Sequence, residues 1–96
     1  MALSERILRL DPSQVAVAVN LGTYYMKRGR AQDAIRLWKT ALSRSPGLTG
    51  ARINLAVAQH RAGDTNTAMA TLRKALDYDP DNEAARKLLA EMKAGK

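Results

Sequence analysis

The sequence predicts an all-α protein, a right-handed α-solenoid of helix–turn–helix repeats closed by a C-terminal capping helix. Pro12, Pro46 and Pro80 lie 34 residues apart, a period typical of stacked repeats. Within each period the apolar residues follow the i, i+3, i+4, i+7 spacing of one helix face. No long segment alternates with a period of two, so no sheet is expected.

The two periods, residues 15–48 and 49–82, agree at eight aligned positions. The matched pairs are Asn20/Asn54, Leu21/Leu55, Gly29/Gly63, Ala34/Ala68, Trp38/Leu72, Ala41/Ala75, Leu42/Leu76 and Pro46/Pro80. One of these pairs joins two large apolar residues and the others are identities. Chance would rarely place so many matches in one register, so each period is one repeat of two helices.

Each expected helix has an apolar face of its own, and six helices are expected, near residues 2–10, 14–28, 31–44, 48–62, 65–78 and 82–94. The faces are, in order, Leu3, Ile7 and Leu8; Ala18, Leu21, Gly22 and Tyr25; Ala34, Trp38, Ala41 and Leu42; Leu55, Ala56 and Gln59; Ala68, Leu72, Ala75 and Leu76; and Leu88, Leu89 and Met92. Trp38 and Tyr25 should fill gaps that alanines and Gly22 leave between helices.

The helix ends are marked by glycine and proline. Gly29 and Gly63 should form the turns within the repeats, because glycine ends a helix at little steric cost. Each proline follows one helix and opens the next, with Ser13 and Asp81 as expected N-caps. The last helix should carry a polar outer face of Arg86, Lys87, Glu91 and Lys93, as a capping helix does.

The combined motif resembles the tetratricopeptide repeat. It consists of Leu21-Gly22-x-x-Tyr25, Ala34-x-x-x-Trp38, Ala41 and Pro46, with a similar second copy. Departures from the family pattern include Arg52, where the family often has Trp, and Gln59, where it often has Tyr. The resemblance divides the single domain 1–96 into 1–14, the second half of a truncated preceding repeat, repeats 15–48 and 49–82, and 83–96, the capping helix and tail.

Composition excludes several functions. The chain of 96 residues has no cysteine, and no apolar run reaches the ~20 residues that cross a membrane. No leader is recognised, so the compartment is unassigned, with the cytoplasm as default. The net charge is +7, and residues 15–48 alone carry six basic side chains against one acid. This excess suggests an acidic partner or good solubility; contact with nucleic acid through Lys27, Arg28 and Arg30 is disfavoured, since no base-stacking aromatics accompany them.

No catalytic, metal or cofactor site is expected. His60 is the one histidine, and no nucleophile stands in a triad-like context with it. Asp77, Asp79 and Asp81 match the start of a calcium loop. However, Asn82 stands where that loop requires Gly and Leu88 where it requires Glu. A helix junction explains this acidic segment better, and the chain is interpreted as a non-enzyme.

The resemblance implies that the first helix of each repeat lines a concave peptide-binding groove. The expected lining residues are Val19, Asn20, Thr23, Met26 and Lys27 from the first repeat and Ile53, Asn54, Val57, His60 and Arg61 from the second. The recurring Asn20 and Asn54 resemble the asparagine ladder of another protein of that family. An amide can hold both the C=O and the N–H of an extended backbone. The alternative is that each Asn bonds within its own repeat or faces water.

A protein or peptide ligand is therefore the expected partner, with acidic residues favoured by Lys27, His60 and Arg61. A carboxylate clamp, the second binding mode of the family, is rejected because its positions here are Val19, Thr23, Asn54, Ala84 and Leu88, of which Asn54 alone fits. The alternative function is a scaffold that self-associates into a homo-oligomer through the uncovered N-terminal helix.

Overall fold

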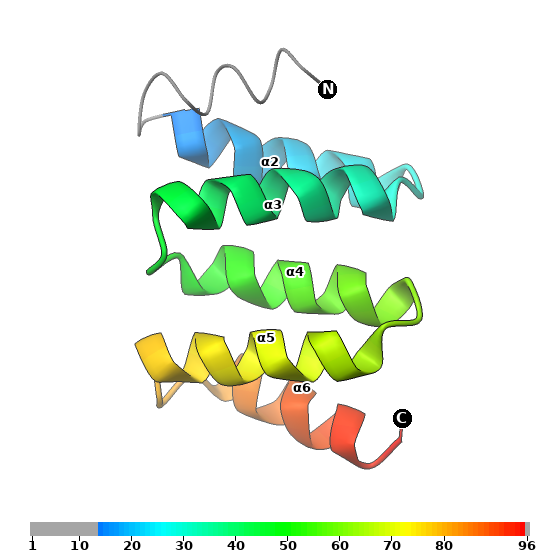
Figure 1. Ribbon diagram of the computed structural model, residues 1–96, viewed down its shortest axis with the longest axis vertical. Coiled ribbons are helices and arrows are strands. Elements are labelled where there is room, and N and C mark those ends of the chain that lie inside the picture. Colours follow the sequence, from blue (N-terminus) through cyan, green and yellow to red (C-terminus); the bar gives the residue numbers. More distant parts are fainter. Residues whose placement is uncertain (1–13, 96) are drawn as a thin grey trace.

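The computed structural model describes residues 14–95, and in that range the chain is a stack of helices joined by short turns (Figure 1). The helices are α2 (Gln14–Lys27), α3 (Ala31–Arg44), α4 (Thr49–Arg61), α5 (Thr65–Tyr78) and α6 (Glu83–Lys93). Each helix packs against the next one along the chain. The expected boundaries of these five helices agree within one residue, and the helix expected at 2–10 lies outside the described residues.

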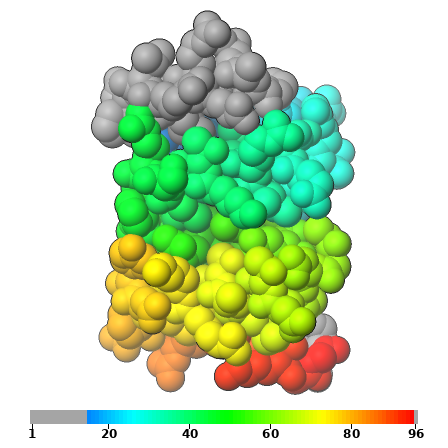
Figure 2. Space-filling model, viewed as in Figure 1, coloured from blue at the N-terminus to red at the C-terminus, as the bar shows by residue number. Residues whose placement is uncertain are grey.

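The two hairpins, α2–α3 and α4–α5, present different helices on the two sides of the stack. In Figure 1, α2 and α6 lie behind α3 and α5. In the space-filling view of Figure 2, α3 and α5 cover most of the face turned toward the viewer. Figure 1 thus places α2 on the opposite side of the stack from α3.

Both turns inside the repeats use glycine in the left-handed region, as expected from the sequence. Gly29 has a φ of 78° and Gly63 a φ of 92°. The N–H of Arg30 donates to the carbonyl of Tyr25 at 2.8 Å, and the equivalent bond at the second turn measures 2.9 Å. This hydrogen bond, across a left-handed residue, satisfies a carbonyl that the end of the helix leaves free.

The core consists of two buried clusters, one for each repeat. The first surrounds Trp38, which is 2% exposed, and joins side chains of α2, α3 and α4. The second surrounds Leu72, which is fully buried, and joins α4, α5 and α6. Trp38 and Leu72 occupy the same position in their repeats, so the aligned pair marks the centre of each cluster.

The close approach of α2 and α3 depends on Gly22. A Cβ atom at this position would lie 2.6 Å from Cε2 of Trp38, well inside contact distance. The indole Nε1–H of Trp38 donates to the carbonyl oxygen of Val19 at 3.1 Å, one turn before Gly22 on α2. The five-membered ring of the indole therefore packs against the backbone of α2, at a place where a side chain would exclude it.

The last helix is held by a cap that the sequence analysis placed one residue too early. Asp81 lies in the turn, and α6 begins at Glu83, so the N-cap position falls on Asn82. The side-chain oxygen of Asn82 accepts from the N–H of Ala85 at 2.9 Å. The expected cap Ser13 lies outside the described residues.

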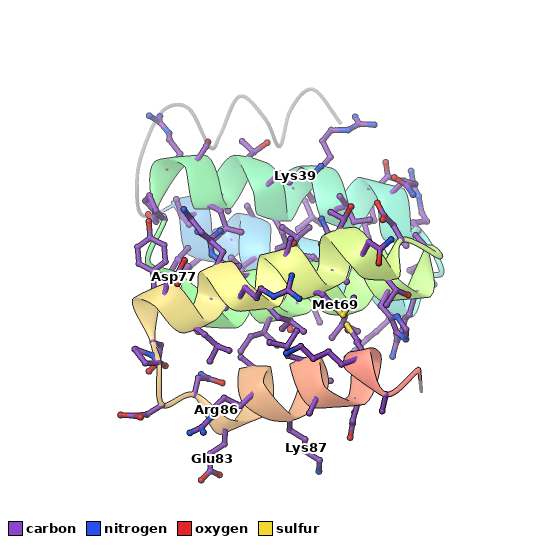
Figure 3. The ribbon with its side chains drawn as sticks, turned by 60° about the horizontal axis from the view of Figure 1, so that its bottom comes forward. Lys39, Met69, Asp77, Glu83, Arg86 and Lys87 are labelled. Carbon is purple, nitrogen blue, oxygen red and sulfur yellow. The ribbon has the colours of Figure 1, made fainter. Side chains whose placement is uncertain are left out.

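The capping helix α6 has the two-sided character expected of it. Ala85 and Met92 are buried against the second cluster, with Leu88 and Leu89 half-buried beside them. Arg86, Lys87, Glu91 and Lys93 are exposed. Figure 3 shows Glu83, Arg86 and Lys87 projecting from α6 on the side away from α5. Within residues 14–95 no helix is long and apolar enough to cross a membrane.

Candidate functional site

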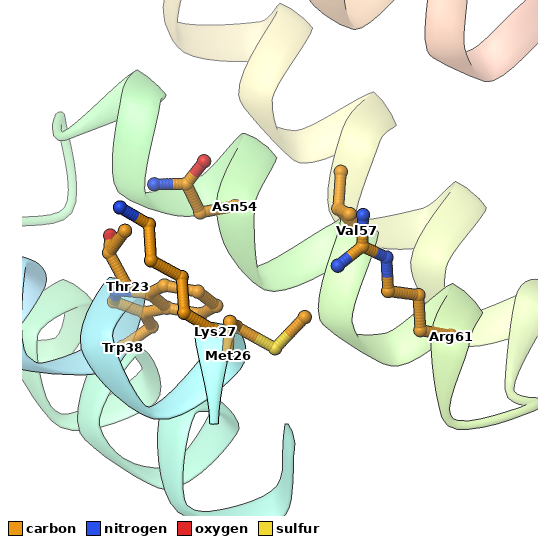
Figure 4. Close-up of a pocket in the computed structure, with 7 residues that line it drawn as sticks. All are labelled: Thr23, Met26, Lys27, Trp38, Asn54, Val57 and Arg61. Atoms are coloured by element: carbon orange, nitrogen blue, oxygen red, sulfur yellow. The ribbon is translucent and has the colours of Figure 1, made fainter. Parts of the chain in front are cut away.

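A pocket of about 250 Å³ lies between the first helices of the two repeats (Figure 4). It is lined by side chains of α2 and α4, together with one residue of α3. The lining residues are Thr23, Met26, Lys27, Trp38, Asn54, Val57 and Arg61. Six of them belong to the groove that the sequence analysis predicted, and the structure brings these six together.

The base of the pocket is apolar. Met26 and Val57 are half-buried on its two sides, and the buried Trp38 completes it from α3. The sequence analysis assigned Trp38 to the core and missed its second role in the pocket. No pattern in the sequence indicates this second role, because Trp38 lies on the apolar face of its own helix.

Two cations stand at the edge of this pocket. Lys27 and Arg61 are the last residues of α2 and α4 and occupy the same position in the two repeats. Both are exposed, and neither forms an ion pair with any of residues 14–95. Cations at a helix C-terminus complement the helix dipole. Unpaired, they also give the pocket a positive edge.

The two repeated asparagines have free amides. Asn54 is half-buried and lines the pocket, whereas Asn20 is exposed on α2 and lies outside it. Neither side chain makes a hydrogen bond with another described residue. Bonding within the repeat is therefore excluded for these amides among the described residues, which leaves the ladder and simple exposure to water as the alternatives.

Four of the predicted groove residues do not line the pocket: Val19, Asn20, Ile53 and His60. The carbonyl of Val19 accepts from the Oγ1 hydroxyl of Thr23 at 3.3 Å as well as from Trp38. Ile53 packs against the second core cluster. His60 lies with Nδ1 2.9 Å from Oγ1 of Thr65, a contact that ties the end of α4 to the start of α5.

Most of the basic cluster considered for nucleic acid is engaged within the protein. The guanidinium of Arg28 lies over the ring of Tyr24, 5.2 Å from its centre. The guanidinium of Arg30 lies 4.9 Å from the ring centre of Tyr25 and pairs with Asp33 at 2.7 Å. Lys27, in contrast, reaches the pocket, so the charge of this cluster is not presented as one surface.

The residues that could carry other chemistry are dispersed. Among residues 14–95 no three His, Cys, Asp or Glu side chains gather in a way that could hold a metal ion. In the acidic segment considered for calcium, a carboxylate oxygen of Asp79 accepts from the side-chain amide of Asn82 at 3.1 Å. This bond belongs to the junction between α5 and α6.

Comparison with known proteins gives the family. A profile described as tetratricopeptide repeat matches residues 25–92. The chain belongs to the tetratricopeptide repeat family. A rat protein, "FK506-binding protein-like" from Rattus norvegicus, is 33% identical over 81 residues, which cover 84% of this chain and 23% of the rat protein. The chain thus spans under a quarter of that relative. Tetratricopeptide repeats generally serve as protein-interaction domains and are typically non-catalytic.

Proposed function

We propose that this tetratricopeptide repeat chain is a non-catalytic module that binds an extended peptide segment of a partner protein across α2 and α4. The observation that carries the proposal is the pocket between these two helices, with an apolar base and polar groups at its edge. Binding sites for ligands are concave and mostly apolar, with a few polar groups that set orientation.

The asparagines supply the second argument. Asn20 and Asn54 lie one repeat apart on the two lining helices, and both amides are free of other described residues. Packed helices lie about 10 Å apart, and an extended peptide rises about 3.3 Å per residue, so one repeat corresponds to about three peptide residues. Two amides in this arrangement match the spacing of backbone groups in one extended peptide.

Asn20 and Asn54 are not explained by helix stability alone. Asparagine is a poor helix former, below Ala, Leu or Gln. Its recurrence at one position of both lining helices, with no partner for either amide, supports a role in ligand binding over a role in folding.

A peptide-display selection on the purified chain, followed by measurement of the best peptide against two variants, tests this function. Replacing Asn20 and Asn54 together by Ala should weaken that peptide by about tenfold or more, because each lost amide contact is worth about 1 kcal/mol. The matched control replaces Asn66, which is exposed on α5, by Ala, and should leave the affinity unchanged. A selected peptide that tolerates the double substitution would overturn the assignment of the groove.

Self-association is the second candidate, and one observation favours it. Val17 and Tyr24 on α2 are 53% and 50% exposed. In the second repeat their equivalents, Ala51 and Ala58, are buried in the cluster that includes α3. The corresponding side of α2 thus presents large apolar side chains where a helix would pack. Sedimentation equilibrium over a concentration series tests this candidate, and a strict monomer at the highest concentration would remove it.

A further inference from the structure

We propose that the pocket between α2 and α4 anchors an aliphatic side chain of the peptide, and that Lys27 and Arg61 bind an Asp or Glu two residues away from it. This inference rests on the proposed function and names the peptide class that the site prefers. It follows from the base of the pocket, the unpaired cations and the distance between the asparagines and those cations.

The base of the pocket selects an aliphatic side chain. Met26 and Val57, together with the small exposed part of Trp38, present an apolar surface. The volume of about 250 Å³ is below the range of about 300–1,000 Å³ that holds a drug-sized ligand. One aliphatic side chain of a peptide fits this space, while a cofactor does not.

The edge of the pocket selects a carboxylate. Lys27 and Arg61 bring two positive charges to the pocket, one from each lining helix (Figure 4), and no described acid neutralises either of them. The third member of this edge, Asn54, offers an amide with donors and an acceptor. An anionic group placed between the two cations gains from both, and a cationic group at the same place is repelled by both.

The asparagines and the cations have the same spacing on α2 and on α4. Lys27 follows Asn20 by seven residues, and Arg61 follows Asn54 by the same number. Seven residues of α-helix rise about 10.5 Å. The Cα atoms of the two cations therefore lie two helical turns beyond those of the asparagines, but the long stem of Lys27 turns back toward Asn54 (Figure 4). An acidic side chain of a peptide held at the asparagines is thus within reach of this charge.

The same geometry sets the spacing within the peptide. Side chains at positions i and i+2 of an extended strand point to the same side, whereas those at i and i+1 point to opposite sides. An aliphatic residue over Trp38 and a carboxylate at the cations must both face the protein. The recognised segment is therefore aliphatic-Xaa-acidic, or the reverse order, inside a chain rather than at its C-terminus.

The test begins with display of random twelve-residue peptides whose C-termini are fused to the coat protein. The best peptide is then synthesised with an amidated C-terminus, and a second version carries Gln in place of its acidic residue. Both are titrated by fluorescence anisotropy against the wild-type chain and against Lys27→Gln with Arg61→Gln. The control is Lys39→Gln, because Lys39 is exposed on α3 and does not line the pocket (Figure 3).

The inference predicts an interaction between the two changes. Replacing the acidic residue should weaken binding to the wild-type chain about fivefold, and to the double variant by less than about twofold. The loss on the wild-type chain should shrink as salt is added, since these charges are exposed. Lys39→Gln should behave as wild type. Circular dichroism of each variant checks that its helices are intact.

Four results would overturn the inference. Selected peptides without the aliphatic-Xaa-acidic spacing would do so, as would an equal loss on both proteins in the titration. In either case a peptide that still depends on Asn20 and Asn54 leaves the proposed groove standing. A third version of the best peptide carries a free C-terminal carboxylate instead of the amide, and binding by this version alone would assign the cations to a terminal carboxylate. Failure to select any peptide would count against both the inference and the proposed function.

Discussion

Replacing Gly22 by Ala should lower the free energy of unfolding of this protein. At an exposed position inside a helix, the same replacement usually raises it. Alanine is favoured over glycine inside a helix by about 1 kcal/mol. At position 22, however, the new Cβ would lie 2.6 Å from Cε2 of Trp38 and 3.0 Å from its Cδ1. The ring that must give way is buried and is bonded to the carbonyl of Val19.

The magnitude follows from these opposing effects. Forcing an extra carbon into a packed core costs about 1–3 kcal/mol. Pulling the indole N–H away from Val19 leaves a buried donor unsatisfied and costs about 1 kcal/mol more. The gain in helix propensity offsets about 1 kcal/mol of this. A net loss of about 2 kcal/mol in the free energy of unfolding results, or a fall in Tm of about 10 °C for a domain of this size.

Urea unfolding followed by circular dichroism and by fluorescence measures this loss, since Trp38 is the one tryptophan in the chain. Gly50→Ala is the matched control. Gly50 lies in α4 with nothing within 4 Å of a Cβ at that position, so its replacement should stabilise by about 0.5 kcal/mol. A Gly22→Ala variant as stable as wild type, or more stable, would refute the argument that α2 and α3 meet through this glycine.

Two further changes test the packing of the second repeat. Thr71→Val should lower the free energy of unfolding in urea by about 1–2 kcal/mol. The hydroxyl of Thr71 donates to the side-chain oxygen of the buried Gln59 at 2.6 Å, and its loss leaves that oxygen without its donor. An unchanged unfolding midpoint would contradict this role. Asn82→Ala should lower Tm by about 5 °C through loss of the N-cap of α6, whereas Asp81→Ala should leave Tm within about 1 °C of wild type; equal effects of the two would contradict the assignment of the cap.

The fold could be predicted from the sequence because the residues that fill the core and form the turns recur with a period of 34 residues. The pair Trp38/Leu72 marks the centre of each buried cluster, and the pair Gly29/Gly63 marks each left-handed turn. A repeat places each residue type in the same environment twice, so chance matches are averaged out. The N-cap of α6 was missed because Asp81 and Asn82 are both good caps, and a one-residue shift in the start of the helix decides between them.

The contacts of Arg52 could not be derived from the pattern. Arg52, which replaces an expected Trp, donates from Nη2 to the carbonyl of Pro46 at 2.8 Å, and its guanidinium lies 5.2 Å from the ring centre of Tyr78. It thereby joins α4 to the turn before it and to the end of α5. Periodicity identifies which face of a helix is covered. It carries no information about a hydrogen bond to a carbonyl six positions earlier or a cation–ring contact 26 positions later.

The candidate site was predicted in part for the same reason. The phase of each lining helix is periodic, so Thr23, Val57 and the two cations were expected on the side of the helices where the pocket lies. The depth of the pocket depends instead on how far α2 and α4 separate, and the ring of Trp38 fills that separation from a third helix. Trp38 packs in the core and also lines the pocket, and no pattern in the sequence distinguishes such a residue from one that lies wholly in the core.

The most direct test of the central claim, that α2 and α4 form the binding surface, is an NMR titration of the labelled chain with a display-selected peptide. The account predicts that shifted amides cluster in α2 and α4, and that the single indole N–H signal of Trp38 shifts with the same affinity. Shifts confined to the exposed positions of α3 and α5, with the indole signal unmoved, would contradict it.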